Sequence, residues 1–261
     1  MITVGLDLGT QRVKAVILKD DAVVARAQAF AGFDPAQAAE EVVAKALRQA
    51  NLKLSDVAYV VATGASMEMA PYADSTISMM GADAKAGVYL YAKARTIIDV
   101  GAEEARAVKC GEKGVMVDFV VNERCAAGAG AFIEAMARAL EVKLEEMGPL
   151  SLKAERASPI NASCVIFGES DVVSLIHRQE PKPEIARAIF DAMADRVTSM
   201  VHRLGVNPDV VLIGGVAKDV GFVAALKRKL GVDVHIPDFP DYAGALGAAL
   251  TAASRAKETQ K

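Results

Sequence analysis

The sequence has no tryptophan, and aromatic residues make up only 5% of its 261 positions. Its formal net charge is −3, and its lysines and arginines form no basic stripe. Proteins that bind nucleic acids usually carry such a stripe, often with aromatic residues between the basic ones. We therefore expect no nucleic-acid partner.

Long hydrophobic runs are also missing, although hydrophobic residues make up 52% of the chain. A membrane-spanning helix needs about 20 consecutive apolar residues, and no run of that length occurs. The first twenty residues carry charges at Asp7, Arg12 and Lys14, and they contain no apolar segment followed by a small-residue cleavage site. We expect a cytoplasmic protein with no membrane partner.

Cysteine is scarce, and the three cysteines cannot build a disulfide framework. Cys110 lies on a predicted strand, where we expect it to be simply buried. Cys125 and Cys164 each lie just ahead of a predicted helix. The free amide groups and the dipole at a helix N-terminus favour a thiolate or an anionic cluster. These two cysteines are therefore candidate metal ligands.

Two thiolates are half of what a [4Fe-4S] cluster requires. A two-fold or pseudo-two-fold dimer would supply the other two. A zinc ion held by four cysteines across a dimer is the alternative, but neither cysteine belongs to a Cys-x-x-Cys pair of the kind that zinc ribbons use. The pattern therefore favours an iron–sulfur cluster shared between two chains.

Apolar strands and helices alternate along the chain, which indicates an α/β protein. Three predicted strands cover residues 2–30, and a helix (35–50), a strand (57–63) and a second helix (82–94) follow. The pattern restarts at Arg95, where IDVGA (98–102) repeats LDLGT (6–10). The crude repeat predicts two lobes that face a nucleotide cleft, with domains at 1–94 and 95–261.

Three glycine turns follow apolar strands and could bind a nucleotide. Asp7 and Gly9 form the first turn, Asp99 and Gly101 form the second, and Gly214 and Gly215 form the third. A carboxylate beside free backbone amides can hold a Mg²⁺-bound phosphate. Taken alone, each Asp-x-Gly turn is better explained as an ordinary turn. The order of the three resembles the phosphate-1, phosphate-2 and adenosine motifs of the actin, sugar kinase and Hsp70 superfamily. No P-loop motif occurs.

Four segments resemble one family nearly colinearly over the whole chain: GLDLGTQRVKAVILKD, NERCAAGAGAFIEAMA, INASCVIFGESDV and DYAGALGAAL. The family is the BadF/BadG/BcrA/BcrD-type ATPases, which include activators of 2-hydroxyacyl-CoA dehydratases and subunits of ATP-dependent benzoyl-CoA reductases. The resemblance implies a duplicated actin-like fold related to ribonuclease H. It also implies ATP with Mg²⁺, and one [4Fe-4S] cluster shared across a dimer.

The resemblance assigns roles residue by residue. Cys125 and Cys164 would be cluster ligands. The phosphates would meet Asp7, Gly9, Thr10, Gln11, Lys14, Asp99 and Gly101, and adenosine would meet Gly214, Gly215 and Gly244. The catalytic candidates are Asp7, Asp99 and Glu103. Activators usually carry Gly-Gly-Gln-Asp after the second aspartate, whereas this chain has Gly101, Ala102, Glu103 and Glu104. Glu103 stands in the place of that glutamine and is the candidate for positioning water.

This departure looks more like the smaller ATPase subunit of a benzoyl-CoA reductase, which pairs with a non-identical ATPase subunit. The resemblance thus implies a heterodimer that drives low-potential electrons from a ferredoxin-type donor to catalytic acyl-CoA reductase subunits. One alternative is a homodimeric activator of a 2-hydroxyacyl-CoA dehydratase. Two others are a small-molecule kinase of the same superfamily and a nucleotide-binding module without turnover.

Overall fold

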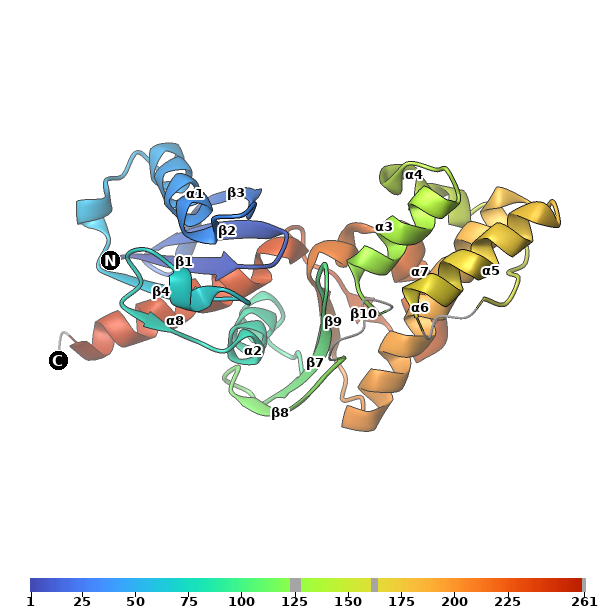
Figure 1. The fold of residues 1–261 in the computed structure, drawn as a ribbon. Coiled ribbons are helices and arrows are strands. Elements are labelled where there is room, and N and C mark those ends of the chain that lie inside the picture. The colour runs from blue at the N-terminus through green and yellow to red at the C-terminus, as the bar shows by residue number, and fades with distance from the viewer. Residues whose placement is uncertain (123–127, 161–163, 260–261) are drawn as a thin grey trace. The chain divides into compact units, whose positions relative to one another are not determined.

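A computed structural model describes residues 1–122, 128–160 and 164–259. The chain packs into two compact units (Figure 1). Unit 1 comprises Met1–Ala94, Cys110–Val117 and Asp241–Lys261, and unit 2 comprises Arg95–Lys109 and Asp118–Pro240. The domain boundaries predicted from the repeat remain a prediction. The segment Cys110–Val117 and the C-terminal helix pack with unit 1, although both follow residue 94 in the sequence.

Unit 1 is built on a five-stranded sheet in the order β3-β2-β1-β4-β5. Strands β1 (Ile2–Leu8), β2 (Arg12–Lys19) and β3 (Ala22–Phe30) form an antiparallel meander. Strands β4 (Tyr59–Thr63) and β5 (Ser75–Thr76) extend the sheet in parallel. Alternate apolar side chains such as Leu6, Ala15 and Ala27 are buried beneath α1 (Pro35–Gln49) in one hydrophobic core.

The other face of this sheet packs against α8 (Ala243–Thr259), which in turn packs against α2 (Met79–Leu90). Gly5 makes the close approach possible, because a Cβ atom there would lie 2.0 Å from the Ala245 carbonyl oxygen and 2.2 Å from the Ala249 nitrogen. Two short 3₁₀ helices, Leu54–Asp56 and Met67–Met69, flank β4. The last helix of the chain thus completes the first unit.

Unit 2 is built around a second five-stranded sheet in the order β10-β9-β6-β7-β8. Its strands are β6 (Thr96–Val100), β7 (Ala105–Cys110), β8 (Met116–Val121), β9 (Val210–Ile213) and β10 (Val234–His235). Strands β6 and β7 are antiparallel, whereas β9 runs parallel to β6 and to β10. The β6–β7 hairpin therefore repeats the β1–β2 hairpin of unit 1, as the sequence repeat predicts.

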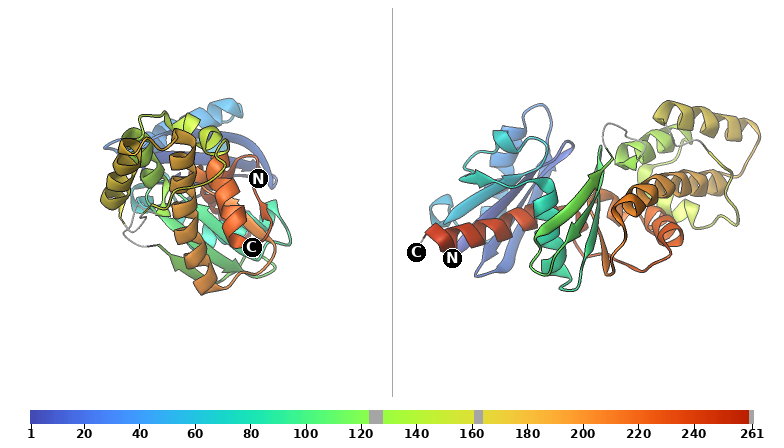
Figure 2. Two further views of the ribbon diagram at one scale, coloured as in Figure 1. Left: turned by 90° about the vertical axis from the view of Figure 1, so that its right-hand side faces the viewer. Right: turned by 90° about the horizontal axis from the view of Figure 1, so that it is seen from below.

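The helices of unit 2 all lie on one side of its sheet (Figures 1 and 2). Phe132, Phe190 and Phe222 are fully buried there, in a core shared with β6, β7 and β9. No helix within the described ranges is long and apolar enough to cross a bilayer. The α-helices that the structure describes here are α3 (Gly130–Ala139), α4 (Leu144–Ser151), α5 (Val165–His177), α6 (Lys182–Leu204) and α7 (Val220–Leu230). A 3₁₀ helix covers Gly215–Lys218, and another, Pro240–Tyr242, begins at the last residue of unit 2 and continues into unit 1.

Candidate functional site

In unit 1 the carboxylate of Asp7 pairs with Lys14 on the neighbouring strand. The two residues lie directly opposite each other in the β1–β2 register, so their side chains share one face of the sheet. The Lys14 Nζ atom donates a hydrogen bond of 2.9 Å to Asp7 Oδ2, and both side chains are about 15% exposed (15% and 16%). This pair is partly desolvated and still accessible to a ligand.

Glycines leave room around the Asp7 carboxylate. Gly64 has a φ of +100°, and a Cβ atom there would lie 2.7 Å from Asp7 Oδ1. A Cβ atom at Gly244, in the first turn of α8, would lie 3.3 Å from the same carboxyl group. Gly9 opens the β1–β2 turn, in which Thr10 and Gln11 are exposed. The structure therefore brings Asp7, Lys14, the glycine turn and Gly244 together, and it adds Gly64.

Unit 2 contains a matching pair, in which Arg106 on β7 faces Asp99 on β6. The Arg106 Nη2 atom donates to Asp99 Oδ2, and its Nη1 atom donates to Glu104 Oε1 at 2.9 Å. Arg106 and Asp99 are buried, whereas Glu104 is more exposed. Arg106 was not among the residues predicted for the site. The signal was the repeat itself, because Arg106 follows Asp99 by seven residues, as Lys14 follows Asp7.

The turn after β9 meets the loop after β6. Gly214 has a φ of +90°, which an L-residue rarely adopts, and a Cβ atom there would lie 2.2 Å from Asp99 Oδ1. The Gly101 amide donates to the Glu104 carbonyl at 2.9 Å and closes the β6–β7 turn. Gly215 has open space around it. Asp99, Gly101, Gly214 and Gly215 thus form one group, and Glu103 is exposed in the turn beside them.

The loop after β6 is hydrogen-bonded to the start of α3. The Gly130 amide donates to the Gly101 carbonyl at 2.9 Å, and the Ala131 amide donates to the Ala102 carbonyl at 2.7 Å. A Cβ atom at Gly130 would lie 3.2 Å from Cγ2 of Val216, which belongs to the turn after β9. The first turn of α3 is therefore in contact with both glycine turns of unit 2.

Cys164 is the N-cap residue of α5, where it is half-buried and forms no disulfide. Helix α5 packs against α3. Cys110 is buried and lies 3.5 Å from the Ala94 carbonyl oxygen, which confirms its predicted burial. Cys125 lies outside the described residues. Among the residues that are described, no group of three side chains could hold a metal ion.

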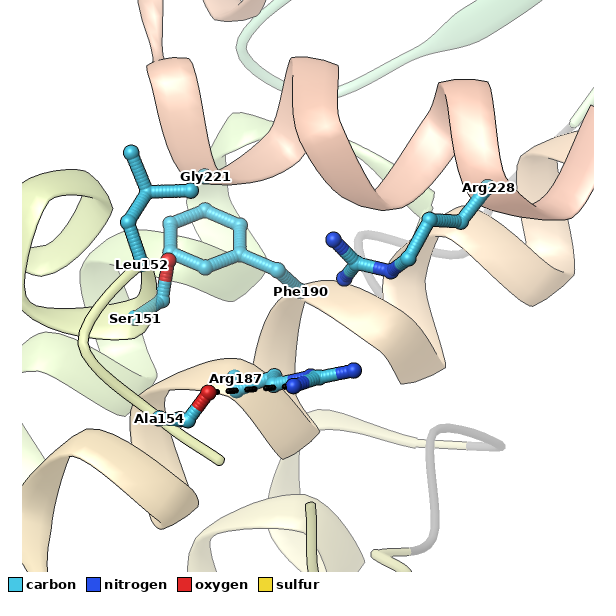
Figure 3. Close-up of a pocket in the computed structure, with 7 residues that line it drawn as sticks. All are labelled: Ser151, Leu152, Ala154, Arg187, Phe190, Gly221 and Arg228. Atoms are coloured by element: carbon cyan, nitrogen blue, oxygen red, sulfur yellow. Dashed lines mark hydrogen bonds between the residues drawn. The ribbon is translucent and has the colours of Figure 1, made fainter. Parts of the chain in front are cut away.

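A small cavity of about 90 Å³ lies beside α6 and α7, around the ring of Phe190 (Figure 3). Two arginines line it. Arg187 donates to the Ala154 carbonyl at 3.1 Å, and Arg228 donates to Asp191 Oδ1 at 2.5 Å. Arg228 therefore links α7 to α6, and Arg187 links α6 to the segment after α4. We assign no ligand to this cavity.

The two acid–cation pairs, with their glycine turns on two similar sheets, define an ATP-binding protein of the actin-like class. A solved structure with the same fold is the activator of the 2-hydroxyisocaproyl-CoA dehydratase from Clostridium difficile with bound ADPNP. It matches with a TM-score of 0.94 and 36% identity, over 100% of this chain and 97% of that chain. The predicted actin-like α/β fold is confirmed.

Residues 4–252 match the model of the BadF/BadG/BcrA/BcrD ATPase family, and the chain belongs to this family. It is similar to the activator of lactoyl-CoA dehydratase from Anaerotignum propionicum, with 38% identity over 99% of this chain and 100% of that protein. It is also similar to one of the subunits of the benzoyl-CoA reductase from Thauera aromatica, with 35% identity over 97% of this chain and 94% of that protein.

Proposed function

We propose that this chain is the ATP-hydrolysing, cluster-bearing component of a system that drives low-potential electrons into an acyl-CoA dehydratase or reductase. Membership of an ATPase family supports the hydrolysis, and the names of the relatives support the destination. In this proposal, Asp7 and Lys14 hold the Mg²⁺-bound phosphates from unit 1. Their partners in phosphate binding are Gly9, Thr10, Gln11, Asp99 and Gly101, while Gly214, Gly215 and Gly244 border adenosine.

The observation that carries the proposal is the pair of hydrogen bonds from the first turn of α3 to the carbonyls of Gly101 and Ala102. Because the same loop carries a proposed phosphate contact, a change of nucleotide that moves the loop also moves α3. Helix α3 begins five residues after Cys125 and packs against α5, whose N-cap is Cys164. Nucleotide state is thereby linked to both proposed cluster ligands.

The residues that are present fit such a cluster. Cys164 is accessible, forms no disulfide and lies at the N-terminus of a 13-residue helix, which favours an anionic group. With Cys125, each chain has two thiols to give, so two chains supply the four that a [4Fe-4S] cluster requires. A bound cluster would hold one electron at low potential. Lowering a one-electron potential by about 200 mV costs roughly 5 kcal/mol, which ATP hydrolysis can supply.

Anaerobic purification, followed by iron and sulfide analysis, tests the cluster. We expect about four irons per dimer of ATPase chains and an EPR signal of the reduced protein that changes with MgATP. Cys125→Ser and Cys164→Ser should each lose the iron. A protein that contains no iron after strictly anaerobic purification would contradict the proposal. That result would favour a kinase or a nucleotide-binding module.

A more specific form of the proposal is the smaller ATPase subunit of a benzoyl-CoA reductase-like enzyme. The run Gly101, Ala102, Glu103 and Glu104 supports it, because activators usually carry Gly-Gly-Gln-Asp there. The identity to activators supports the homodimeric alternative equally well. Glu103 remains the candidate for positioning the water that attacks ATP, and a ferredoxin-type protein is the proposed electron donor.

Purification from the native host separates the two forms. A reductase subunit should remain bound to a second, non-identical ATPase subunit and to the catalytic subunits. An activator should elute as a homodimer, free of its dehydratase. Reduction by added ferredoxin, followed through the EPR signal, tests the donor.

A further inference from the structure

The duplication lets corresponding positions in the two hairpins be compared. Asp7 corresponds to Asp99 and Lys14 to Arg106, each 92 residues further along the chain. By the same offset, Arg12 corresponds to Glu104. In unit 2, Glu104 is a carboxylate that pairs with Arg106 at 2.9 Å. In unit 1 the corresponding position is a cation, which cannot pair with Lys14.

Arg12 and Lys14 lie on the same face of β2 because they are two residues apart in a strand, at a spacing of about 7 Å. The β2–β3 register places Phe30 opposite Arg12 and Gln28 opposite Lys14. Asp7 lies on the other side of Lys14 in the same row. This face, defined by Asp7, Arg12, Lys14, Gln28 and Phe30, is the surface from which the proposed phosphate contacts of unit 1 project.

The guanidinium group of Arg12 is held over the ring of Phe30, at 4.2 Å from the ring centroid. Within the described ranges, no carboxylate lies within ion-pair distance of Arg12. Lys14, by contrast, is bonded to Asp7. Burial raises the pKa of the Tyr242 hydroxyl, which Asp241 raises further, while the charges of Lys14, Arg26 and Arg12 act in the opposite direction. Three cations thus gather around Tyr242, at the start of α8.

Two like charges on one face of a strand repel each other unless an anion lies between or beside them. The terminal phosphate of ATP carries nearly two negative charges, as a phosphate monoester does. A guanidinium group binds phosphate through two parallel N–H donors, and stacking on Phe30 restricts where those donors can point. ADP lacks this third phosphate, so its charged end lies one phosphate closer to the nucleoside.

We infer that Arg12 contacts the terminal phosphate of bound ATP and makes unit 1 distinguish ATP from ADP. The inference rests on the proposed nucleotide site and adds a specificity-determining residue to it. In this arrangement, Lys14 and Asp7 hold the Mg²⁺-bound part of the phosphate chain. Arg12 binds the third phosphate, which is present in ATP and absent from ADP.

The test measures ATP and ADP affinities of the anaerobic full-length protein by calorimetry. Arg12→Met should weaken ATP binding by about tenfold or more, which is what the loss of a charged hydrogen bond costs. It should leave ADP binding within about twofold, because ADP does not reach this side chain. Arg26→Met is the matched control, since it removes a cation near the same tyrosine without removing a phosphate ligand.

The outcomes are distinct. Equal losses for ATP and ADP, or equal losses in the two variants, would assign Arg12 a general electrostatic or structural role and overturn the inference while leaving the proposed function intact. A wild-type protein that binds neither nucleotide would overturn both. Phe30→Leu supplies a second variant, which keeps the charge and removes the stacking partner. It should weaken ATP binding by about threefold, as expected for an exposed cation–π contact, again without a matching effect on ADP.

Discussion

Each half of the duplication holds an aspartate with a cation from the neighbouring strand, but the two pairs differ in burial. Asp99 and Arg106 are more buried than Asp7 and Lys14, and Arg106 bonds to a second carboxylate, Glu104. A buried ion pair depends on both partners, because removing one leaves an uncompensated charge away from water. Loss of the cation should therefore lower the free energy of unfolding more at the Asp99–Arg106 pair than at the Asp7–Lys14 pair.

Arg106→Met should lower the free energy of unfolding by about 3 kcal/mol, since the Asp99 carboxylate would remain buried without its cation. Glu104→Gln is the control, because Glu104 is 37% exposed and its loss should cost less than about 1 kcal/mol. Urea unfolding followed by circular dichroism measures both. Similar costs for the two variants would show that Asp99 is solvated well enough to do without Arg106.

Asp219 gives a pH dependence of stability. It caps α7 by accepting hydrogen bonds from the Gly221 and Phe222 amides, at 2.8 and 3.1 Å. Burial raises its pKa above the ordinary value of 3.8, against the effect of those two hydrogen bonds. The folded chain therefore binds this proton more readily than the unfolded chain. The contribution of Asp219 to stability is full below pH 3.8 and is lost as the pH rises through the raised pKa.

Asp219→Asn keeps a capping oxygen and cannot titrate. We expect the stability of the wild type relative to this variant to increase as the pH is lowered from 7 toward 4. Asp233→Asn should show the opposite trend, because the hydrogen bond from Lys227 lowers the pKa of the exposed Asp233 carboxyl. Urea unfolding at several pH values measures both trends, and parallel curves for the wild type and Asp219→Asn would contradict this account.

At the scale of elements, the apolar pattern predicted β1 to β4 and the helices α1 and α2, but it gave no sign of α4. Helix α4 contains Gly148 and Pro149, two residues that disfavour a helix interior. It forms because tertiary packing overrides propensity. A Cβ atom at Gly148 would lie 2.6 Å from Asp219 Oδ1, so glycine is what lets α4 approach α7. The close approach of α8 to Gly5 is a similar case, since no local pattern tells which sheet an alanine-rich helix will cover.

The residues of the candidate site also fall into two groups, those that the sequence pattern predicts and those that it does not. Asp7, Asp99 and the glycine turns could be found because each stands at the end of an apolar strand in a recognisable order. Arg106 could have been found from the repeat, because it follows Asp99 at the spacing at which Lys14 follows Asp7. Gly64 and Arg12 could not, because their places beside the proposed site come from the strand register and from contacts across the sheet. Cross-strand neighbours of a recognised acid are set by pairing, which the sequence specifies only after the register is known.

Gly130 is the element-scale test of the proposed coupling. In Gly130→Ala the new methyl group would lie 3.2 Å from Val216 Cγ2 and 3.3 Å from the Gly101 carbonyl oxygen. The first turn of α3 must then shift relative to the loop after β6. We expect ATP to bind, while the change that MgATP causes in the reduction potential becomes several-fold weaker, in line with about 0.5–2 kcal/mol for residues that carry coupling.

The control for Gly130→Ala is Gly111→Ala, which adds a methyl group with only ordinary contacts, the nearest at 3.8 Å. Potentiometric titration of the cluster with and without MgATP measures both variants. An unchanged response to MgATP in Gly130→Ala would show that the coupling does not pass through the contact between α3 and the loop.

At the scale of the whole molecule, the two units contribute one acid–cation pair each, and the proposed cluster needs a second chain. The described part of one chain provides Cys164, and Cys125 adds the second proposed ligand. Since a [4Fe-4S] cluster takes four thiolates, the proposed cluster is also a link between chains. Cluster content and oligomeric state should therefore change together.

Anaerobic removal of iron with a chelator should convert the cluster-linked dimer into monomers, measured by size-exclusion chromatography with light scattering. Cys164→Ser should be monomeric from the start, whereas Cys110→Ser should remain dimeric, because Cys110 is buried within unit 1.

Reconstitution of the chain expressed alone distinguishes a homodimer from a heterodimer. A homodimeric activator should regain iron and dimerise on reconstitution, but a heterodimeric subunit should do so only with its partner ATPase subunit. A monomer that keeps its iron would contradict the shared cluster.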